Sequence, residues 1–265
     1  MTILALGPEG TFSHELAVRV FPGPVMLVPT ISGIFSQVEA GVCDGIVPIE
    51  NSEAGGVGPT LDGLLQHEVY ITAELFMPIH HYLVSRVPLD EIAVLYAHPQ
   101  THEQCSRFID ELGVPVIHTS SNAASAESMA GSPASAAIVS RMTAGLHHLP
   151  VVTEHVENNP SNTTRFVVIS NRRGEERDCT KCSILVDPEQ DRAGLLYELL
   201  GIFATRNINL TRIESRPSKR GMGRYIFFMD TDYTPGWTDA LRALREKARF
   251  RELGCYRELE VPAWT

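Results

Sequence analysis

Residues 162–169 read Asn-Thr-Thr-Arg-Phe-Val-Val-Ile, and this stretch predicts a buried strand that is entered through polar side chains. The apolar run begins at Phe166, so the residues before it are expected at a sheet edge, where a cleft forms. Thr163 and Thr164 can donate hydrogen bonds to an oxygen, and Arg165 can bind a carboxylate with two parallel hydrogen bonds. The pattern indicates a site that holds an anionic substrate and helps a C–O bond to break. The alternative is a strand cap, with Arg165 in a surface ion pair.

Composition and charge restrict the class of protein. The chain has 265 residues, of which 43% are hydrophobic and 20% charged, as expected for a globular protein of two domains. No apolar run is long enough to cross a bilayer, and no basic region precedes an apolar segment at the N-terminus. We therefore expect a cytoplasmic protein. The net charge of -10 disfavours nucleic acid and membrane surfaces as partners, and it means that local groups must hold any anionic ligand.

The cysteines and histidines predict neither a disulfide framework nor a metal site. Five cysteines are few and scattered, and Cys179-Thr-Lys-Cys182 is a single C-x-x-C pair beside a charged stretch. We expect incidental thiols in a reducing cytoplasm. His80-His81 and His147-His148 are adjacent pairs whose side chains point apart on a strand. We therefore expect no metal.

The chain divides near residue 175, inside a charged stretch (171–178) that has no apolar periodicity. Before it, predicted strands at 3–6, 25–28, 45–49, 92–97, 114–118 and 136–139 alternate with helical segments such as the one whose apolar stripe contains Ile31, Ile34, Phe35 and Val38. This alternation predicts an α/β fold with mainly parallel sheets over residues 1–175.

Four polar junctions lead from predicted strands into helices. Their expected first residues or caps are Thr11 or Ser13, Thr60, His98-Pro99 and Ser120-Ser121-Asn122. In an α/β sheet such junctions gather at the carboxyl ends of the strands, where binding crevices form. Helix N-termini present free N–H groups and partial positive charge, which suit carboxylates. The alternative is that these residues only cap their helices.

The second segment, residues 182–262, predicts a ferredoxin-like domain. Strands are expected at 183–186, 208–214, 225–230 and 255–261, and helices at 191–205 and 238–249, with a hairpin across 218–223. The order is βαββαβ. A domain of this kind beside an α/β body is often regulatory, by analogy with other folds.

Several short motifs follow one another in a fixed order. They are Gly7-Pro-Glu-Gly-Thr-Phe12, Pro48-Ile-Glu-Asn-Ser52 with Thr60-Leu-Asp62, His98-Pro-Gln100 with Gln104-Cys105, Thr164-Arg-Phe166, Asn207-Ile-Asn-Leu-Thr211 and Glu214-Ser-Arg-Pro217. With these motifs the chain resembles, nearly end to end, a monofunctional prephenate dehydratase with a C-terminal ACT regulatory domain. The resemblance implies a catalytic body of two lobes, like that of periplasmic binding proteins, with the active site in the cleft.

The resemblance also implies the reaction. Prephenate loses CO2 and its ring hydroxyl to give phenylpyruvate in phenylalanine synthesis, and because aromatisation drives the step no cofactor is required. By this resemblance Thr164 assists the departing hydroxyl, Phe166 forms an apolar wall, and Arg165 either binds a carboxylate or anchors its strand. Glu50 is either an acid or a structural partner. The candidate ligands of the substrate are Thr11, Asn51, Ser52, Thr60 and Ser121, and Asn122 stands where many relatives have threonine.

For the ACT domain, the resemblance implies feedback inhibition by L-phenylalanine at an interface in a homodimer or homotetramer. Of the two expected effector segments, the one formed by Glu214, Ser215, Arg216 and Pro217 is intact. The other contains Ala193, Gly194, Leu195 and Leu196, with Ala193 in place of the usual proline and Leu195 in place of the usual alanine. The larger Leu195 side chain would weaken or alter effector binding.

Two other functions fit the same motifs. An arogenate dehydratase would use nearly the same site on a substrate that carries an ammonium group instead of the ketone. A non-catalytic amino-acid sensor of the same fold is the alternative from a different class, and the intact Thr164-Arg165-Phe166 argues against it. We expect no fused chorismate mutase, because no helical segment precedes Ile3 or follows the predicted ACT region.

Overall fold

The computed structural model describes residues 2–174, 178–189, 192–218 and 224–262, and its central element is strand β11 (Thr163–Ser170). Strand β11 pairs in antiparallel fashion with β3 (Asp44–Asn51) on one side and β5 (Tyr70–Pro78) on the other. Its alternate side chains enter two different cores: Phe166 and Val168 pack on one face of the sheet, and Val167 and Ile169 on the other. The predicted buried strand is confirmed.

The first lobe surrounds this strand. Its strands lie in the order β5-β11-β3-β1-β2, with β1 (Ile3–Leu6) parallel to β2 (Val25–Val28) and to β3, and with β4 (Gly55–Gly56) paired to β3. Helices α2 (Ile31–Glu39) and α3 (Gly58–Gln66) share a core with one face, and α1 (Phe12–Val20) packs on the opposite face. The stripe that predicts α2 is confirmed, because Ile31, Ile34, Phe35 and Val38 are all buried.

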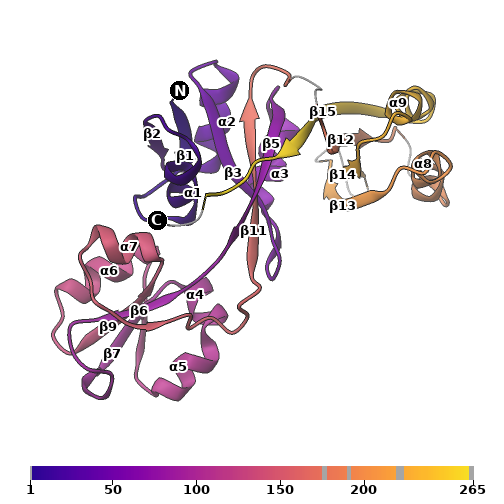
Figure 1. Cartoon of the computed structure of the whole chain (residues 1–265). Helices are drawn as coiled ribbons and strands as arrows, with labels where there is room; N and C mark the ends of the chain where they lie inside the picture. The colour runs from indigo at the N-terminus through magenta and orange to yellow at the C-terminus, as the bar shows by residue number, and fades with distance from the viewer. Residues whose placement is uncertain (1, 175–177, 190–191, 219–223, 263–265) are drawn as a thin grey trace.

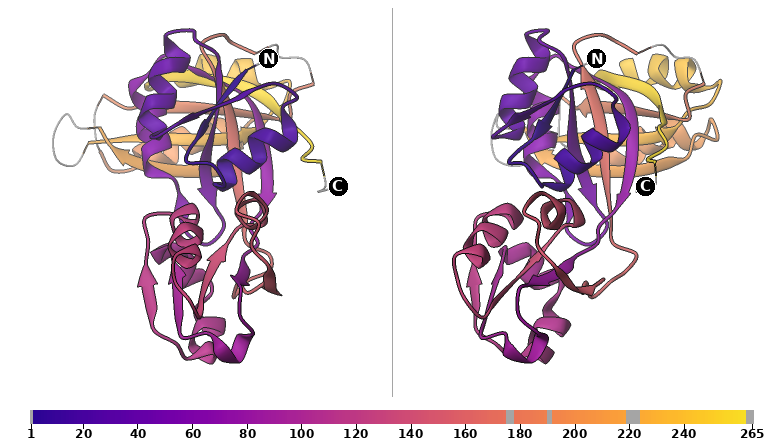
Figure 2. Two further views of the ribbon diagram at one scale, coloured as in Figure 1. Left: turned by 90° about the vertical axis from the view of Figure 1, so that its left-hand side faces the viewer. Right: turned by 60° about the vertical axis from the view of Figure 1, so that its left-hand side comes forward.

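The second lobe contains the middle of the chain (Figure 2). Its sheet has the order β10-β6-β9-β7-β8, and its elements are β6 (Tyr82–Ser85), η1 (Leu89–Glu91), β7 (Val94–Ala97), α4 (Pro99–Gln104), α5 (Ser106–Leu112), β8 (Val116–His118), α6 (Asn122–Ala130), β9 (Ser135–Val139), α7 (Arg141–Leu146) and β10 (Val151–Glu154). Both sheets are mixed, so the expectation of mainly parallel sheets was wrong. The chain crosses between the lobes twice, and the strands at these crossings, such as β11 and β6, run antiparallel to their neighbours.

The C-terminal domain has the predicted βαββαβ order. It consists of β12 (Lys181–Asp187), α8 (Leu195–Ala204), β13 (Leu210–Pro217), β14 (Tyr225–Asp232), α9 (Trp237–Arg245) and β15 (Arg249–Glu258). The strand order β13-β14-β12-β15 is ferredoxin-like, and both helices share one core with the sheet. Helix α8 begins four residues after its predicted start. Most of the predicted hairpin turn, residues 219–223, lies outside the described residues.

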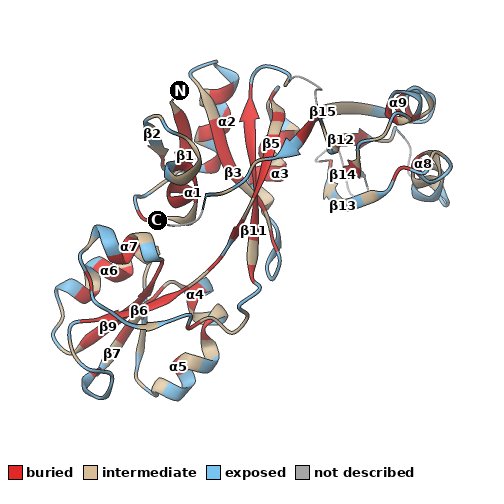
Figure 3. Ribbon diagram, viewed as in Figure 1, coloured by how far each residue is buried: buried red, intermediate tan, exposed pale blue. Residues whose placement is uncertain are grey.

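The first lobe and the C-terminal domain form one continuous sheet. The end of β15 pairs in parallel with β5, with Arg257 opposite Ala73 and Glu258 opposite Glu74 (Figure 1). The face of the C-terminal sheet that α8 and α9 leave open contributes Phe228 and Tyr256 to the core of the first lobe, and buried positions continue along β3 and β11 in Figure 3. The charged stretch therefore separates two sequence segments that share a core.

Two of the cysteines form a disulfide, which the sequence did not predict. Cys182 on β12 and Cys255 on β15 are direct partners in adjacent antiparallel strands, and their sulfur atoms are bonded. The expectation of incidental thiols was therefore wrong for these two, because the strand register that opposes them is set by residues far apart in the chain. Cys43, Cys105 and Cys179 do not belong to this disulfide. In the described part of the chain, no helix is long and apolar enough to cross a membrane.

Candidate active site

A cleft of about 420 Å³ lies between the two lobes, and the beginnings of four helices reach it. Its lining includes the N-cap residues of α1, α3, α4 and α6, which are Thr11, Val57, His98 and Ser121. Thr11 and Ser121 cap through their hydroxyls, which accept hydrogen bonds from the amides of His14 and Ala124 at 3.2 and 3.0 Å. The predicted gathering of strand–helix junctions is therefore present in the structure.

The lining of this cleft carries no Lys, Arg, Asp or Glu side chain among the described residues. An anion in the cleft would be held by backbone N–H groups, hydroxyls and amides. Helix N-termini supply such donors together with partial positive charge. This arrangement explains how a chain of net charge -10 can offer an anion site.

Thr164 faces the cleft and has a defined hydrogen-bond partner. Its Oγ1 accepts a hydrogen bond of 2.9 Å from Nδ2 of Asn51, which also donates to Oδ1 of Asn162 at 2.8 Å. The Asn51 amide is oriented from its other side, because its Oδ1 accepts hydrogen bonds from the amides of Glu53 and Ala54. Asn51 thus presents a donor to Thr164, and the threonine hydroxyl keeps its own proton for another acceptor.

Five predicted site residues line the cleft together, and they are Thr11, Asn51, Ser121, Thr164 and Phe166. Two other predicted substrate ligands have structural partners. Thr60 is fully buried inside α3, where its hydroxyl donates to the carbonyl of Pro48 at 2.5 Å, so its predicted role as a helix cap was wrong. Ser52 holds the entry of β11 by accepting from the amide of Thr163 at 3.0 Å and donating to Asn162 at 3.2 Å.

Arg165 points away from the cleft because it is offset by one residue from Thr164 on an extended strand. It is 5% exposed, and its guanidinium donates to Glu74 at 2.7 Å, to Asp230 at 2.5 Å and to the Tyr256 hydroxyl at 3.0 Å. Of the two roles left open, these contacts are those of a strand anchor and not of a substrate ligand.

The electrostatics of this buried cluster keep Arg165 charged. Burial alone lowers the pKa of Arg165, but Asp230, Tyr256 and Glu74 together hold it above its ordinary value. Burial and the charge of Asp230 raise the pKa of Tyr256, so its hydroxyl stays protonated. Glu50 lies 3.7 Å from Arg165 and 3.5 Å from Arg212, as a structural partner does.

Sequence reasoning missed His81, which lines the cleft from the segment that connects the two lobes. It is 1% exposed, its Nε2 lies 3.0 Å from Oε1 of Gln104, and its Nδ1 is buried without a hydrogen-bond partner. Burial lowers the pKa of His81, so the ring is neutral and Nδ1 is a bare acceptor when Nε2 donates to Gln104. The signal in the sequence was the His80-His81 pair directly after β5, at the crossing between lobes.

Other lining residues come from the helix starts of the second lobe. Gln100 and Thr101 follow the cap of α4, and the Thr101 hydroxyl donates to Oδ1 of Asn122 at 2.9 Å. Asn122, which departs from the usual threonine, is thereby tied to α4. His98 and His102 stand four residues apart, a spacing that the expectation of no metal overlooked, and Nδ1 of His102 lies 2.9 Å from Nε2 of His118.

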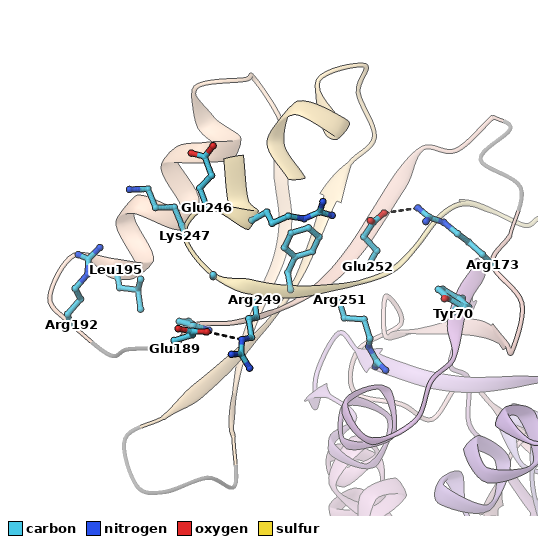
Figure 4. Close-up of a pocket in the computed structure, with 14 residues that line it drawn as sticks. Tyr70, Arg173, Glu189, Arg192, Leu195, Glu246, Lys247, Arg249, Arg251 and Glu252 are labelled. Carbon is cyan, nitrogen blue, oxygen red and sulfur yellow. Dashed lines mark hydrogen bonds and ion pairs between the residues drawn. The ribbon is translucent and has the colours of Figure 1, made fainter. Parts of the chain in front are cut away.

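The two expected effector segments lie at the same end of the C-terminal sheet. Arg192 and Leu195 line a second cavity of about 940 Å³ beside the start of β15, shown in Figure 4. The segment from Glu214 to Pro217 is part of β13 and faces the first lobe, where Nη2 of Arg216 lies 2.9 Å from Oδ1 of Asp62 in the middle of α3. The lining of the second cavity contains no residue of this β13 segment.

The fold and the cleft define a class of protein: a two-lobed α/β body with a cleft between its lobes that the starts of helices reach, joined to a ferredoxin-like domain. Residues 3–174 match the family model of prephenate dehydratase, and residues 189–236 match that of the ACT domain. The chain belongs to the prephenate dehydratase family and carries a C-terminal ACT domain. The predicted family and the predicted fold class are confirmed.

Known proteins agree with this assignment. The prephenate dehydratase of Methanocaldococcus jannaschii is 36% identical over 84% of this chain and 85% of its own length. The bifunctional chorismate mutase/prephenate dehydratase of Pseudomonas aeruginosa is 38% identical over 87% of this chain, which spans 65% of that protein. The crystal structure of prephenate dehydratase from Arthrobacter aurescens in complex with L-Phe has 33% identity and a TM-score of 0.88 over 97% of this chain and 90% of that chain.

Proposed function

We propose that this chain converts prephenate to phenylpyruvate, and the observation that carries the proposal is the Asn51–Thr164 pair at the floor of the cleft. In this reaction the bond between the ring and its carboxylate breaks, and its electron pair enters the ring. The C–O bond on the opposite side of the ring then breaks toward oxygen, which leaves as water once it has gained a proton. Aromatisation supplies the driving force, so the protein must orient the dianion and stabilise the departing oxygen.

The helix starts around the cleft supply the first requirement. Prephenate carries two carboxylates, and the cleft offers the amides at the starts of α1, α4 and α6 together with the Ser121 hydroxyl. Donors that are fixed before the substrate arrives cost no reorganisation during the reaction. Phe12 and Phe166 line the same cleft and provide apolar surface for a ring.

Thr164 supplies the second requirement. Its Oγ1 already accepts from Asn51, so its proton is free to be donated to the departing oxygen as negative charge builds there. The bond from Asn51 also polarises the threonine hydroxyl and makes it a better donor. Thr163 has no such position, because its hydroxyl donates to the carbonyl of Ser161 on the outer side of the strand.

The cleft favours prephenate over arogenate. Arogenate carries an ammonium group where prephenate has a ketone, and a buried ammonium calls for a carboxylate partner. The described lining offers none, whereas its hydroxyl and amide donors suit a ketone oxygen. The Arabidopsis thaliana arogenate dehydratase/prephenate dehydratase 1 is 31% identical to this chain, so both substrates belong in the test.

The regulatory part of the proposal concerns L-phenylalanine, a second subunit and cellular location. The Arthrobacter aurescens relative binds L-Phe, and this chain keeps the Glu214–Pro217 segment. We propose that L-phenylalanine binds between the segments at 193–196 and 214–217 of a homodimer or homotetramer. Tyr197 is 82% exposed, and Ile213 and Tyr225 are 40% and 48% exposed, which leaves apolar surface for a partner copy. We propose a cytoplasmic location because a biosynthetic intermediate is the substrate.

The decisive experiment follows phenylpyruvate formation from prephenate and, in parallel, phenylalanine formation from arogenate. We expect turnover of prephenate that L-phenylalanine suppresses. Thr164→Val, which keeps the volume and removes the hydroxyl, should lower kcat by roughly 10²–10⁴, and Thr164→Ser should recover most of it. Thr163→Val is the matched control and should keep the wild-type rate. A near-normal rate in Thr164→Val would remove Thr164 from the mechanism, and no turnover of either substrate would leave the sensor function.

A further inference from the structure

Two segments carry the chain between the lobes, and they run side by side. Residues 79–81 lead from β5 to β6, and residues 155–162 lead from β10 back to β11. Backbone hydrogen bonds join the two crossings, from the amide of Val156 to the carbonyl of His81 at 3.1 Å and from the amide of Ile79 to the carbonyl of Asn162 at 2.8 Å. These crossings form the connection between the lobes in Figure 1.

Three side chains of these crossings converge on one point. Nδ1 of His80 lies 2.7 Å from Oε1 of Glu157, and Nδ1 of His155 lies 3.2 Å from the same oxygen. The two imidazole rings meet edge to face with centroids 4.5 Å apart. The three ligand atoms all lie within 4.8 Å of one another, and among the described residues no other group of three or more His, Cys, Asp or Glu side chains converges in this way.

The carboxylate of Glu157 is unusual because it is buried with only imidazole side chains as its ion-pair partners. The side chain is 1% exposed, whereas those of His80 and His155 are 32% and 51% exposed. Its second oxygen, Oε2, is fixed by the backbone amide of His81 at 2.9 Å.

We propose that His80, His155 and Glu157 bind a divalent metal ion of the zinc class. Two imidazole nitrogens and one carboxylate oxygen form a common ligand set for catalytic or exchangeable zinc, with water as the fourth ligand. Bonds of about 2.0 Å in a tetrahedral site place the ligand atoms about 3.3 Å apart. The two nitrogen–oxygen separations of 2.7 and 3.2 Å, with all three ligand atoms within 4.8 Å of one another, are near this value.

The surroundings suit a metal site. The amide of His81 donates to Oε2 of Glu157 and so fixes the orientation of the carboxylate, as hydrogen-bond donors behind metal ligands commonly do. His155 adopts a left-handed backbone with φ of 55°, a sparsely populated conformation for a residue other than glycine, and in it the ring meets His80 and Glu157. The ion would neutralise a buried charge that no Lys or Arg in the described chain pairs with.

The proposed metal site lies between the two segments that connect the lobes. One ligand comes from the first crossing and two come from the second, so the ion would cross-link the only segments that connect the lobes in the described chain. Movement of two lobes about a cleft is absorbed by such hinge segments. His81, the neighbour of His80, lines the cleft, so the site lies one residue from the substrate region. This inference stands apart from the proposed reaction, because metal binding is measured without substrate.

The full-length protein is first freed of metal with a chelator and kept without reductant. It is then titrated with Zn²⁺ by calorimetry, and its Tm is measured at each ratio of Zn²⁺ to protein. We expect one equivalent to bind and to raise Tm, because the folded state holds the ligands together. His155→Ala, at a half-exposed position, and Glu157→Gln should each weaken that binding by about 100-fold, since each removes one of three ligands. His118→Ala and Cys179→Ser are the controls: the first removes a histidine that contacts His102 and not the proposed site, and the second removes a thiol. Both should bind Zn²⁺ as the wild type does.

The outcomes separate the proposal from its alternatives. If His155→Ala no longer binds one equivalent of Zn²⁺ and both controls still do, the result supports a metal site at the crossings. Three results would overturn it. The first is a Zn²⁺ affinity in His155→Ala within twofold of the wild type, and the second is loss of binding in either control. The third is no saturable binding up to about 1 mM Zn²⁺, a concentration at which any functional zinc site is occupied. Because His155 lies at the surface, failure to fold does not confuse the result.

Discussion

Arg165 donates a 2.5 Å hydrogen bond from Nη1 to the buried carboxylate of Asp230, and this contact joins β11, the strand that also carries Thr164, to the ACT domain. Thr164 and Arg165 are neighbours on β11, so one faces the cleft and the other faces the ACT sheet. A rearrangement of β14 would therefore displace Arg165, and with it β11, whose Thr164 lines the cleft. The ion pair is a direct physical connection between the regulatory and catalytic parts.

The first prediction concerns the strength of this connection. Asp230→Asn leaves Arg165 charged and buried without one of its anionic partners, so we expect the free energy of unfolding to fall by about 3–5 kcal/mol in urea titrations. Asp239→Asn is the matched control, because its ion pair with Arg242 is exposed on both sides and the same substitution should change stability little. A loss in Asp230→Asn no larger than that in Asp239→Asn would show that the pair contributes nothing measurable.

The second prediction concerns Asn51 as a positioning residue. Asn51→Ala removes the donor that orients the Thr164 hydroxyl, and a reacting group that is misplaced by about 1 Å can lose 10²-fold in rate. We expect kcat to fall by up to about 10²-fold, with a smaller change in KM, because the helix starts that hold the substrate remain. Steady-state kinetics of Asn51→Ala are compared with those of Ser52→Ala, which loosens the same loop but keeps the donor to Thr164. A larger fall of kcat in Asn51→Ala would show that this donor positions Thr164. A change confined to KM would instead make Asn51 a substrate ligand.

The outline of the fold was accessible from the sequence because it depends on local pattern. The apolar run from Phe166, the apolar stripe of α2 and the caps at Thr11, His98 and Ser121 are properties of neighbouring residues. Since the carboxyl ends of strands adjoin the following helices, the gathering of these caps at one cleft also followed.

The features that were missed depend on pairing across long stretches of chain. Cys182 meets Cys255 only through the register of β12 and β15, and Arg165 meets Asp230 only because the ACT sheet packs behind β11. Thr60 was misassigned because the helix begins two residues earlier, at Gly58. His81 was overlooked because its partner in the cleft, Gln104, lies on a different element.

The third prediction concerns the dependence of stability on pH. The pKa of His81 in the folded protein lies below the 6.5 of an ordinary histidine because the ring is buried. Between these two pKa values the unfolded chain binds more protons than the folded one, so stability rises with pH. We expect wild-type Tm to fall as pH decreases from 7 through 6.5, and His81→Gln to show a shallower fall. His118→Gln, at an exposed position, should follow the wild type. Equal slopes in all three proteins would contradict this.

The fourth prediction concerns the Cys182–Cys255 disulfide. A digest of the protein purified with thiols blocked should contain a linked pair of peptides carrying these two residues. Because the link closes a loop of 73 residues, the double variant Cys182→Ala/Cys255→Ala should unfold with a free energy about 2–4 kcal/mol lower. Cys43→Ala, at a free and half-buried thiol, is the control. Recovery of both thiols as single blocked peptides would exclude the disulfide under the conditions of purification.

The fifth prediction concerns Leu195 and the effector. Leu195 is the first residue of α8, and by the resemblance of its motif it replaces an alanine. With Arg192 it lines the cavity beside β15. If the larger side chain narrows the effector pocket, Leu195→Ala should raise the affinity for L-phenylalanine about tenfold, the effect of roughly one or two methylene groups in an apolar site. Calorimetric titration of the full-length protein with L-phenylalanine measures this. Leu146→Ala, an exposed leucine in the second lobe, should leave the affinity unchanged. Unchanged or weaker binding in Leu195→Ala would show that this side chain contributes favourable contacts to the effector or none at all.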